Sequence, residues 1–509
     1  MPLSPPLRDK LALAALAAAT VGCAMTNFGE SLWIDELHTA WTVGGALGDV
    51  LPRAAEGNQG PLYFWLLWLW TKSAGLNEIT LRLPSLLPAI GLPLVVYAFV
   101  RRFDRDSAAG RLAPLFAATL AATDMYTIYY AQEARPYAWV LLGAVLHVGA
   151  LLAWLERPTA ARWWLLVLGA IGLFHLHYTT ELLFAAEGTV LLVAKLQRRE
   201  SWKFHLRDAL LVPLVVAALC APSLPHIRMI AERRKNWEAF IDPPRWFDFW
   251  WTFPAALAIF VVLAGAAVRR YRRSQEETLG RLPLIVALWL FVPLTIAFVC
   301  TRLQWAPLFY YRYLLVALPA SWILAALALR AFPGRWAPYC TAVVILAAWL
   351  QQQGPLRSWW DHGTVLVARN EDWRGAVARL NELAAENAEP IVVDPDLIES
   401  KRVSDASFTP GLRSLLLSPV RSLYPLRVAD ERLYTIASLH DQALTQADYE
   451  RLNQCSGAWW ICRNMGPHVI ALSGGGRTIW FYSEGVPGDT FGNVWVGRMV
   501  RMDRPTPKE

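Results

Sequence analysis

The sequence contains little charge and little cysteine. Only 17% of its 509 residues are Asp, Glu, Lys or Arg, whereas ordinary soluble proteins carry about 25%. Six cysteines in so long a chain exclude a small disulfide-stapled scaffold, and 55% hydrophobic residues exclude a disordered chain. Neither glycine-rich nucleotide loop, G-x-x-x-x-G-K-[ST] or G-x-G-x-x-G after a strand, occurs. The composition therefore argues against an ordinary soluble enzyme and against a nucleotide site.

Long apolar runs, 26 tryptophans and a net charge of +7 indicate a polytopic membrane protein. We interpret the positive balance as a topological signal and not as a sign of nucleic-acid binding. A membrane-spanning helix needs about 20 mostly apolar residues. About eleven segments meet or approach this length, namely residues 11–28, 82–100, 111–127, 137–155, 162–178, 181–196, 208–225, 251–268, 282–300, 313–331 and 336–353.

The basic residues give these spans an orientation. With the N-terminus inside, the loops on the inner side and the N-terminus hold 20 of the 31 basic residues in 1–353, as the positive-inside rule requires. The apolar segment 61–70 is short and would invert every later loop, so we expect an interfacial helix there, in the first outside loop. An odd number of spans places the C-terminus outside the cytoplasm. Short loops favour a bacterial inner membrane.

The composition changes near residue 353. Residues 354–509 hold 17 basic and 19 acidic residues, a higher charge density than in the preceding part. We predict a membrane domain over 1–353 and an extracytoplasmic (periplasmic) soluble α/β domain over 354–509. In the latter, residues 373–386 have helical periodicity, and residues 389–395, 459–461 and 478–482 read as strands. For Cys455 and Cys462, a disulfide and two free thiols are both open.

Two adjacent acids, Asp35 and Glu36, follow the first span. A carboxylate at a dry interface can serve as a general base. The alternative is structural, because acids are also favoured in the first turn of a helix. Gln59 lies further along the same loop, in a turn that leads into the interfacial helix, and is a candidate substrate contact.

Further polar residues lie at the outer ends of predicted spans. Arginine recognises phosphate with its planar fork, and tyrosine faces stack on sugars. Each of these residues also has a structural alternative, as a surface ion pair, a solvated face or an aromatic-belt anchor. The candidates for phosphate binding are Arg135, Arg312, Tyr313, Arg233 and Arg234, and those for substrate binding are Glu133, Tyr137 and His177.

A divalent metal ion is a further open question. His175 and His177 are two residues apart and could bind a metal together with a carboxylate such as Glu36. Interfacial hydrogen bonding is the more frequent role of such a pair. Glu187 lies inside a predicted span, and we expect it to face a neighbouring helix.

The ordered motifs resemble those of the GT-C glycosyltransferases, in particular the protein O-mannosyltransferase-like superfamily, with glycosyltransferase family 39 and the aminoarabinose lipid A transferases. The resemblance covers about residues 10–353 and rests on five motifs in order. They are Trp33-Ile34-Asp35-Glu36, Gln59-Gly60-Pro61-Leu62-Tyr63, residues 77–85, Gln132-Glu133-Ala134-Arg135-Pro136-Tyr137 and Arg312-Tyr313-Leu314-Leu315.

The resemblance implies a sugar donor linked to polyprenyl phosphate and an acceptor hydroxyl on a glycan, lipid or protein outside the cytoplasm. It implies that Asp35 is the catalytic base of an inverting transfer and that Glu36 supports it or helps to hold a metal. It also places Tyr313 near the lipid phosphate. Two other functions remain open: a flippase or transporter for polyprenyl-linked glycans, and a ligase or polymerase that uses them.

Overall fold

Most of the apolar segments form helices in the computed structural model. The structure describes residues 5–104, 112–196, 206–233, 241–253, 281–332, 336–353, 355–366, 368–404, 408–437, 443–464, 469–474, 477–483 and 489–502. Ten of the eleven predicted spans coincide with helices in these ranges, and nearly all of the span at 251–268 lies outside them. Among the described residues, five helices are long and apolar enough to cross a membrane. The number of eleven spans stays a prediction.

The chain is divided into two compact units. One comprises residues 1–28 and 82–367, and the other comprises residues 29–81 and 368–509. We call them the membrane unit and the mixed unit. The mixed unit combines the first predicted outside loop with the C-terminal region, which begins at residue 368. The predicted domain border at residue 353 stays a prediction.

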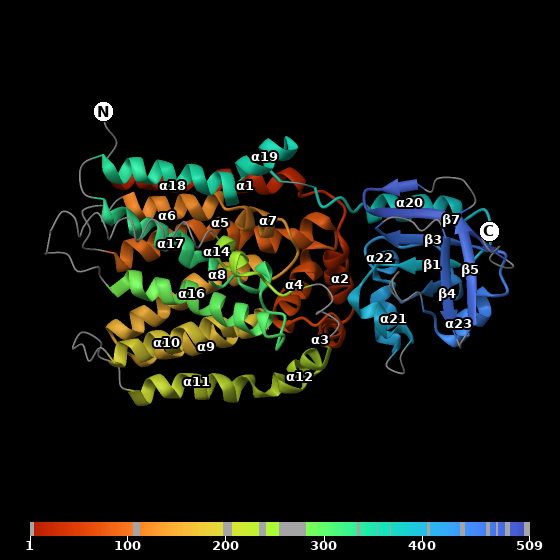
Figure 1. Cartoon of the computed structure of the whole chain (residues 1–509), viewed down its shortest axis with the longest axis horizontal. Helices are drawn as coiled ribbons and strands as arrows, with labels where there is room; N and C mark the ends of the chain where they lie inside the picture. The colour runs from red at the N-terminus through yellow and green to blue at the C-terminus, as the bar shows by residue number, and fades with distance from the viewer. Residues whose placement is uncertain are drawn as a thin grey trace. The chain divides into compact units, whose positions relative to one another are not determined.

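The membrane unit is a helical bundle (Figure 1). Its first helices are α1 (Pro5–Ala24), most of α5 (Glu78–Phe103), α6 (Leu112–Thr123), α7 (Met125–Ala131), α8 (Tyr137–Glu156) and α9 (Ala160–Leu176). They are followed by α10 (Glu181–Leu196), α11 (Leu206–Cys220), α12 (Leu224–Arg233), α14 (Trp246–Trp251), α16 (Arg281–Arg302), α17 (Leu318–Ala328), α18 (Ala337–Gln353) and α19 (Pro355–His362).

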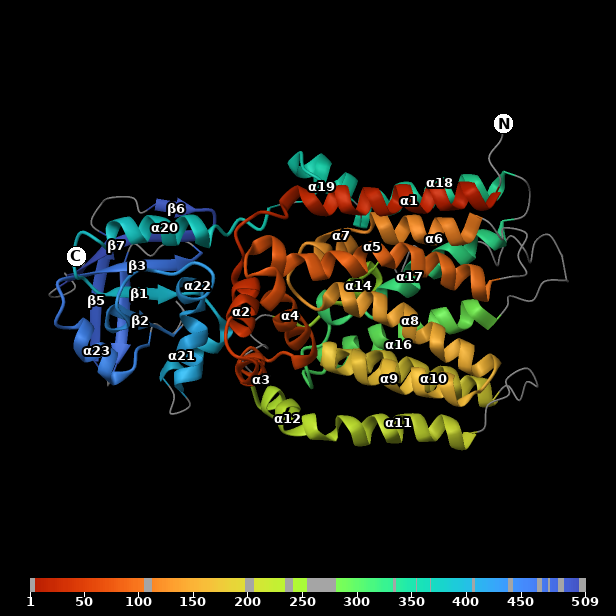
Figure 2. The ribbon, with the colours of Figure 1, turned by 180° about the vertical axis from the view of Figure 1, so that it is seen from behind.

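Helix α17 lies at the centre of the bundle, since all of its residues are buried. It packs against α6, α8 and α16. Helix α11 packs against α9 at the edge of the bundle and is mostly exposed within this unit (Figure 2). An apolar surface without a protein partner is expected where a helix faces lipid.

Several polar groups inside the bundle are paired across helices. Asp124 caps α7, and its carboxylate accepts hydrogen bonds from the backbone N–H of Tyr126 at 2.9 Å and from Trp322 Nε1 at 3.0 Å. The side chains of Asp104 and Arg330 form an ion pair between the end of α5 and the end of α17. Unpaired polar groups are costly in an apolar interior, so these contacts fix the register of neighbouring helices.

The mixed unit is built around a seven-stranded sheet. Its strands are β1 (Ile391–Asp394), β2 (Leu433–Thr435), β3 (Gly457–Arg463), β4 (Val469–Gly474), β5 (Arg477–Ser483), β6 (Asp489–Phe491) and β7 (Val494–Met502). Their order is β2-β1-β3-β7-β5-β4, with β6 paired to β7. Strand β1 is parallel to β2 and β3, whereas the other pairs are antiparallel. The strands expected near 389–395, 459–461 and 478–482 are β1, β3 and β5.

Helices cover this sheet. Helix α20 (Trp373–Leu383) contacts β6 and β7 (Figures 1 and 2). It buries Trp373, Ala376, Val377 and Leu380, as its helical periodicity predicted. The other helices in the described part of the C-terminal region are η6 (Ile398–Ser404), α21 (Pro410–Leu416), α22 (Ser418–Arg421), η7 (Asp430–Arg432) and α23 (Gln446–Leu452).

The first loop forms three helices of the mixed unit, α2 (Ile34–Val43), α3 (Leu47–Glu56) and α4 (Pro61–Ala74). Helix α4 covers the segment for which an interfacial helix was expected, and its interfacial location stays a prediction. Its 14 residues span about 21 Å at 1.5 Å per residue, which is short of a bilayer core. Trp41 of α2 packs with Leu412 and Leu415 of α21, and its Nε1 donates to Ser414 Oγ at 2.9 Å.

The two cysteines of the C-terminal region are free thiols, so the structure does not contain the disulfide considered above. Cys462 lies on β3 and points into the core of the sheet, where it is fully buried. Cys455 follows α23, and its Sγ donates to the carbonyl of Arg451. The side chain of Cys462 is therefore committed to core packing.

Asp394 ends β1 beside Cys462 and is fully buried. Burial, assisted by the neighbouring charge of Asp396, raises the pKa of Asp394 to about 7. Because the native pKa exceeds the unfolded value of about 3.9, the stability conferred by protonated Asp394 is lost as the pH rises from 4 through 7. Relative to the Asp394→Asn variant, the free energy of unfolding of the wild-type mixed unit should fall by about 2–4 kcal/mol between pH 5 and pH 8.

Urea unfolding of the full chain in nanodiscs, read by proteolysis of the C-terminal region, measures this difference. Asp430→Asn, at an exposed acid of the same unit, is the control and should keep the wild-type pH dependence. An equal pH dependence in wild type and Asp394→Asn would contradict the assignment.

Candidate functional site

The two predicted acids occupy the first turn of α2. Glu36 is fully buried, and Asp35 is partly exposed. Arg369 NH1 lies 3.4 Å from Glu36 Oε2, and the Arg369 side chain is only 7% exposed. The ion pair holds Glu36 in place, so the two adjacent acids have different environments. Asp35 is the more exposed of the two.

His38 lies one turn after Asp35 on the same helix and was not identified from the sequence. Its ring is buried between Trp41 and Phe64, with ring centroids 5.8 and 5.9 Å away. Its Nε2 lies 3.3 Å from the carbonyl of Arg53 and 3.3 Å from Thr42 Oγ1. The spacing from Asp35 was the available signal, because residues three apart share a helix face.

Gln59 does not join these acids through any contact that the structure gives. Its Nε2 donates to the carbonyl of Gly57 at 3.2 Å, within its own loop. The preceding Asn58 has a positive φ of 56° and donates to Glu399 Oε1 at 3.0 Å. The structure thus supports the turn that the sequence predicted and leaves the substrate role of Gln59 a prediction.

A second group of predicted residues gathers in the membrane unit. The turn between α7 and α8 buries Gln132, Glu133 and Arg135 almost completely. Ser85 Oγ of α5 donates to the carbonyl of Arg135 at 3.1 Å and fixes the turn. A turn that buries both an acid and an arginine is not a surface ion pair, which was the structural alternative.

Aromatic rings extend from this turn. The ring of Tyr137 lies 4.7 Å from that of Tyr130 and 5.6 Å from that of His177. The ring of His177 lies 5.8 Å from that of Tyr313, which follows Arg312 in a short 3-10 helix, η4 (Tyr311–Tyr313). The guanidinium groups of Arg135 and Arg312 both act electrostatically on His177.

We call Arg135, Tyr137, His177, Arg312 and Tyr313 the arginine–tyrosine cluster. Its members come from three separate segments, all of which the sequence had marked. The cluster combines two permanent cations with aromatic faces, the chemistry that suits a sugar phosphate.

The basic loop is only partly described. Arg233 ends α12, close enough to His226 to act on it electrostatically. His226 Nδ1 lies 2.8 Å from the hydroxyl of Tyr178, which follows His177. Arg234 lies outside the described residues.

The candidate metal ligands do not form a site among the described residues. No group of three His, Cys, Asp or Glu side chains gathers there with metal-binding geometry. His177 Nδ1 is 2.7 Å from Thr179 Oγ1, and the ring of His175 packs on Phe174. The two histidines have the hydrogen-bonding and packing roles given as the alternative, and Glu36 is paired with Arg369.

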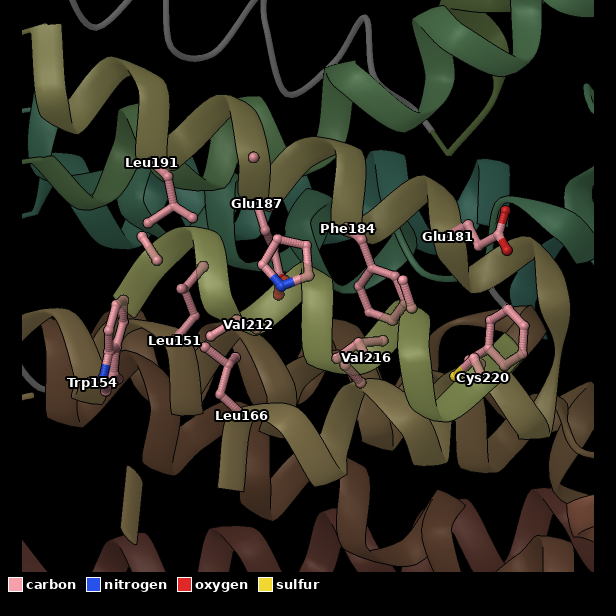
Figure 3. Close-up of a pocket in the computed structure, with 16 residues that line it drawn as sticks. Leu151, Trp154, Leu166, Glu181, Phe184, Glu187, Leu191, Val212, Val216 and Cys220 are labelled. Atoms are coloured by element: carbon pink, nitrogen blue, oxygen red, sulfur yellow. The ribbon is translucent and has the colours of Figure 1, made fainter. Parts of the chain in front are cut away.

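A cavity of about 270 Å³ lies between α8, α9, α10 and α11 (Figure 3). Its lining is apolar apart from Glu181 and Glu187. Glu187 is 3.0 Å from His147 Nε2 of α8, which confirms that it faces a neighbouring helix. The cavity begins at Glu181, four residues after His177. It was not predicted, because its lining reads as ordinary apolar helix surface.

The comparisons with known proteins agree with part of this description. Residues 58–226 match the family model described as dolichyl-phosphate-mannose-protein mannosyltransferase, which confirms for that segment the resemblance inferred from the motifs. The match covers about a third of the chain. No curated protein sequence matches.

Two solved structures have a similar arrangement. ArnT from Cupriavidus metallidurans in the apo state is 13% identical, with a TM-score of 0.49 over 95% of this chain and 97% of that one. The Archaeoglobus fulgidus oligosaccharyltransferase, in complex with Zn and sulfate, is 12% identical, with a TM-score of 0.41 over 88% of this chain and 67% of that one.

The packing of His38 generates a stability prediction. A Cβ added to Gly57 would lie 2.2 Å from the His38 ring, which Trp41 and Phe64 prevent from retreating. We expect Gly57→Ala to destabilise the mixed unit by about 1–3 kcal/mol through overpacking. His38→Ala in the same chain should remove most of this additional cost. Thermal unfolding of the four chains of the double-mutant cycle measures the coupling.

Gly48→Ala is the matched control, because an added Cβ there meets nothing within 4 Å. It lies inside α3 and should be neutral or slightly stabilising. Additive effects of the Gly57 and His38 substitutions would show that the ring does not restrict this site.

Proposed function

We propose that the chain is a membrane glycosyltransferase that moves a sugar from a polyprenyl-phosphate donor to an acceptor hydroxyl outside the cytoplasm. The observation that carries the proposal is the arginine–tyrosine cluster, in which the buried Arg135, the partly buried Arg312 and aromatic rings come together from three distant segments. The family match over residues 58–226 supports glycosyl transfer as the reaction. The distribution of basic residues supports a bacterial inner membrane, with Asp35 and the C-terminal region on the periplasmic side.

In this proposal Asp35 is the general base. It takes the proton of the acceptor hydroxyl as that oxygen attacks the anomeric carbon of the sugar. The bond from this carbon to the phosphate oxygen breaks, and its electron pair leaves with the polyprenyl phosphate. Attack from the opposite side inverts the anomeric configuration. Glu36 supports Asp35, and Arg135 and Arg312 stabilise the charge that grows on the departing phosphate.

The charges of the lining residues suggest where the sugar phosphate and the hydrocarbon chain of the donor bind. Tyr137, His177 and Tyr313 offer faces and hydrogen bonds to the sugar phosphate. The cavity between α8 and α11 has two carboxylates and apolar walls, so it repels the phosphate and suits part of the hydrocarbon chain. Glu133 and Gln59 remain proposed substrate contacts, and Arg233 and Arg234 remain proposed contacts of the lipid phosphate.

Release of free polyprenyl phosphate tests the reaction. With purified protein in nanodiscs and a panel of polyprenyl-phosphate sugars, wild type should release polyprenyl phosphate from at least one donor. Asp35→Asn should lower turnover about 10²–10⁴-fold and retain donor binding, because only the proton acceptor is lost. Asp49→Asn, at a partly exposed acid of α3, is the matched control. EDTA should leave the rate unchanged.

Three results would contradict parts of this proposal. If Asp35→Asn turned over at the wild-type rate, Asp35 would not be the general base. Loss of activity in EDTA that Mg²⁺ or Mn²⁺ restores would show that a metal takes part. Transport of a lipid-linked glycan without release of polyprenyl phosphate would favour the flippase alternative.

The proposed chain cavity has its own test. Ala217 lines the cavity from α11, whereas Ala218 on the same helix is exposed and does not line it. We expect Ala217→Trp to raise KM for a long-chain donor about tenfold, the equivalent of about two buried methylene groups. Ala218→Trp should leave KM unchanged. Equal KM values in the two variants would place the hydrocarbon chain elsewhere.

A further inference from the structure

A carboxylate from the C-terminal region caps the helix that carries the two acids. The N-cap residue of α2 is Trp33, whose side chain makes no capping hydrogen bond. The backbone N–H of Ile34 instead donates to Glu371 Oε2 at 3.1 Å. The first N–H groups of a helix need acceptors from outside the helix, and Glu371 supplies one from 337 residues away.

Glu371 is itself fixed to the sheet. Its Oε1 accepts from two nitrogens of Arg463, at the end of β3, both at 2.8 Å. Its Oε2 also accepts from Trp373 Nε1 at 3.2 Å. The backbone of Glu371 forms a bridge with Gly492, between β6 and β7. Gly492 has a positive φ, and an added Cβ would lie 2.2 Å from the carbonyl oxygen of Asn370.

Arg369, which is separated from Glu371 by Asn370 in the sequence, contacts the same first turn of α2. It forms the ion pair with Glu36, and its guanidinium carbon lies 5.7 Å from the centre of the Trp33 ring. Cation–π contacts of this kind stabilise a buried guanidinium. Arg369 and Glu371 therefore contact three of the four positions 33–36, namely Trp33, Ile34 and Glu36.

Two further contacts tie down the chain just before α2. The backbone N–H of Leu32 donates to the hydroxyl of Tyr424 at 2.8 Å, and the backbone N–H of Arg374 donates to Ser31 Oγ at 3.1 Å. Burial raises the pKa of Tyr424, so its hydroxyl stays neutral. The entry into α2 is thus held by groups that keep the same charge at ordinary pH.

We propose that Arg369 and Glu371 are positioning residues of the glycosyl-transfer site, which hold the first turn of α2 and thereby set the orientation and ionisation of Asp35 and Glu36. The inference rests on the proposed function in one respect, the role of Asp35 as base. Neither residue needs to touch the substrate. The C-terminal region is then a structural part of the catalytic turn.

The charges around this turn explain why arginine is needed. Three carboxylates, Asp35, Glu36 and Glu371, meet at one helix N-terminus, whose dipole only partly offsets their repulsion. Arg369 pairs with Glu36, and Arg463 pairs with Glu371. Removing Arg369 leaves the negative charge in excess, which disfavours the ionised form of the neighbouring acids.

The pH dependence of turnover distinguishes this role from simple loss of structure. With the donor that wild type uses, Arg369→Met should shift the acidic limb of the pH profile of kcat/KM to higher pH by about 1 unit. Arg369→Lys retains the charge and should return the limb towards the wild-type position. Misfolding would lower the active fraction and leave the limb in place. Arg379→Met is the matched control, because Arg379 pairs with Asp489 and Glu382 on the surface of the same unit.

Hydrogen exchange of the substrate-free full chain in nanodiscs gives a readout that needs no activity. Glu371→Leu leaves the N–H of Ile34 without its acceptor, so amides of residues 32–40 should exchange about tenfold faster or more. Arg379→Met should leave them unchanged. Unchanged exchange in Glu371→Leu, or an unmoved limb in Arg369→Met, overturns the inference. If wild type is silent with every donor, the proposed function fails, and the exchange result alone decides whether Glu371 holds the turn.

Discussion

The first turn of α2 concentrates negative charge, and this charge has to be balanced by groups from elsewhere in the chain. Asp35 and Glu36 are adjacent in the sequence, and Glu371 adds a third carboxylate by capping the helix. Arg369 and Arg463 supply the balancing cations. Buried charge that lacks a partner is strongly destabilising, so the first loop and the C-terminal region depend on each other. This dependence explains why residues 29–81 and 368–509 form one compact unit.

The membrane unit meets the same constraint with different partners. Its apolar helices pack around α17, and polar side chains at depth pair across helices, as Asp124 does with Trp322 and His147 does with Glu187. Other polar groups lie where helices end. The arginine–tyrosine cluster lies at such ends, where α7 meets α8, where α9 ends and where η4 precedes α17. The helix ends of the bundle therefore present cations and aromatic faces at its loops.

Local patterns were sufficient for much of the fold. Runs of about 20 apolar residues and helical periodicity depend only on neighbouring positions. The helices that coincide with predicted spans, the helices α4 and α20 and the strands β1, β3 and β5 were therefore predictable, whereas α2 and α3 were not predicted. The roles of the motif residues stay predictions, but several of these residues lie near one another. Arg135, His177 and Arg312 meet in the structure, although no spacing rule relates positions so far apart. His147, Arg369 and Glu371 were missed because an isolated histidine in a span, or an ordinary charge in a soluble region, carries no local signal.

The sequence by itself determined the class of the protein, its helical segments, the position of the acid pair and the family that its motifs resemble. These properties follow from composition and from short-range order along the chain. Only the tertiary structure decided which carboxylate caps α2, which arginine pairs with Glu36, and that Cys462 packs into a core as a free thiol. Such pairings depend on distances between segments hundreds of residues apart, and those distances are set by the packing of the whole unit.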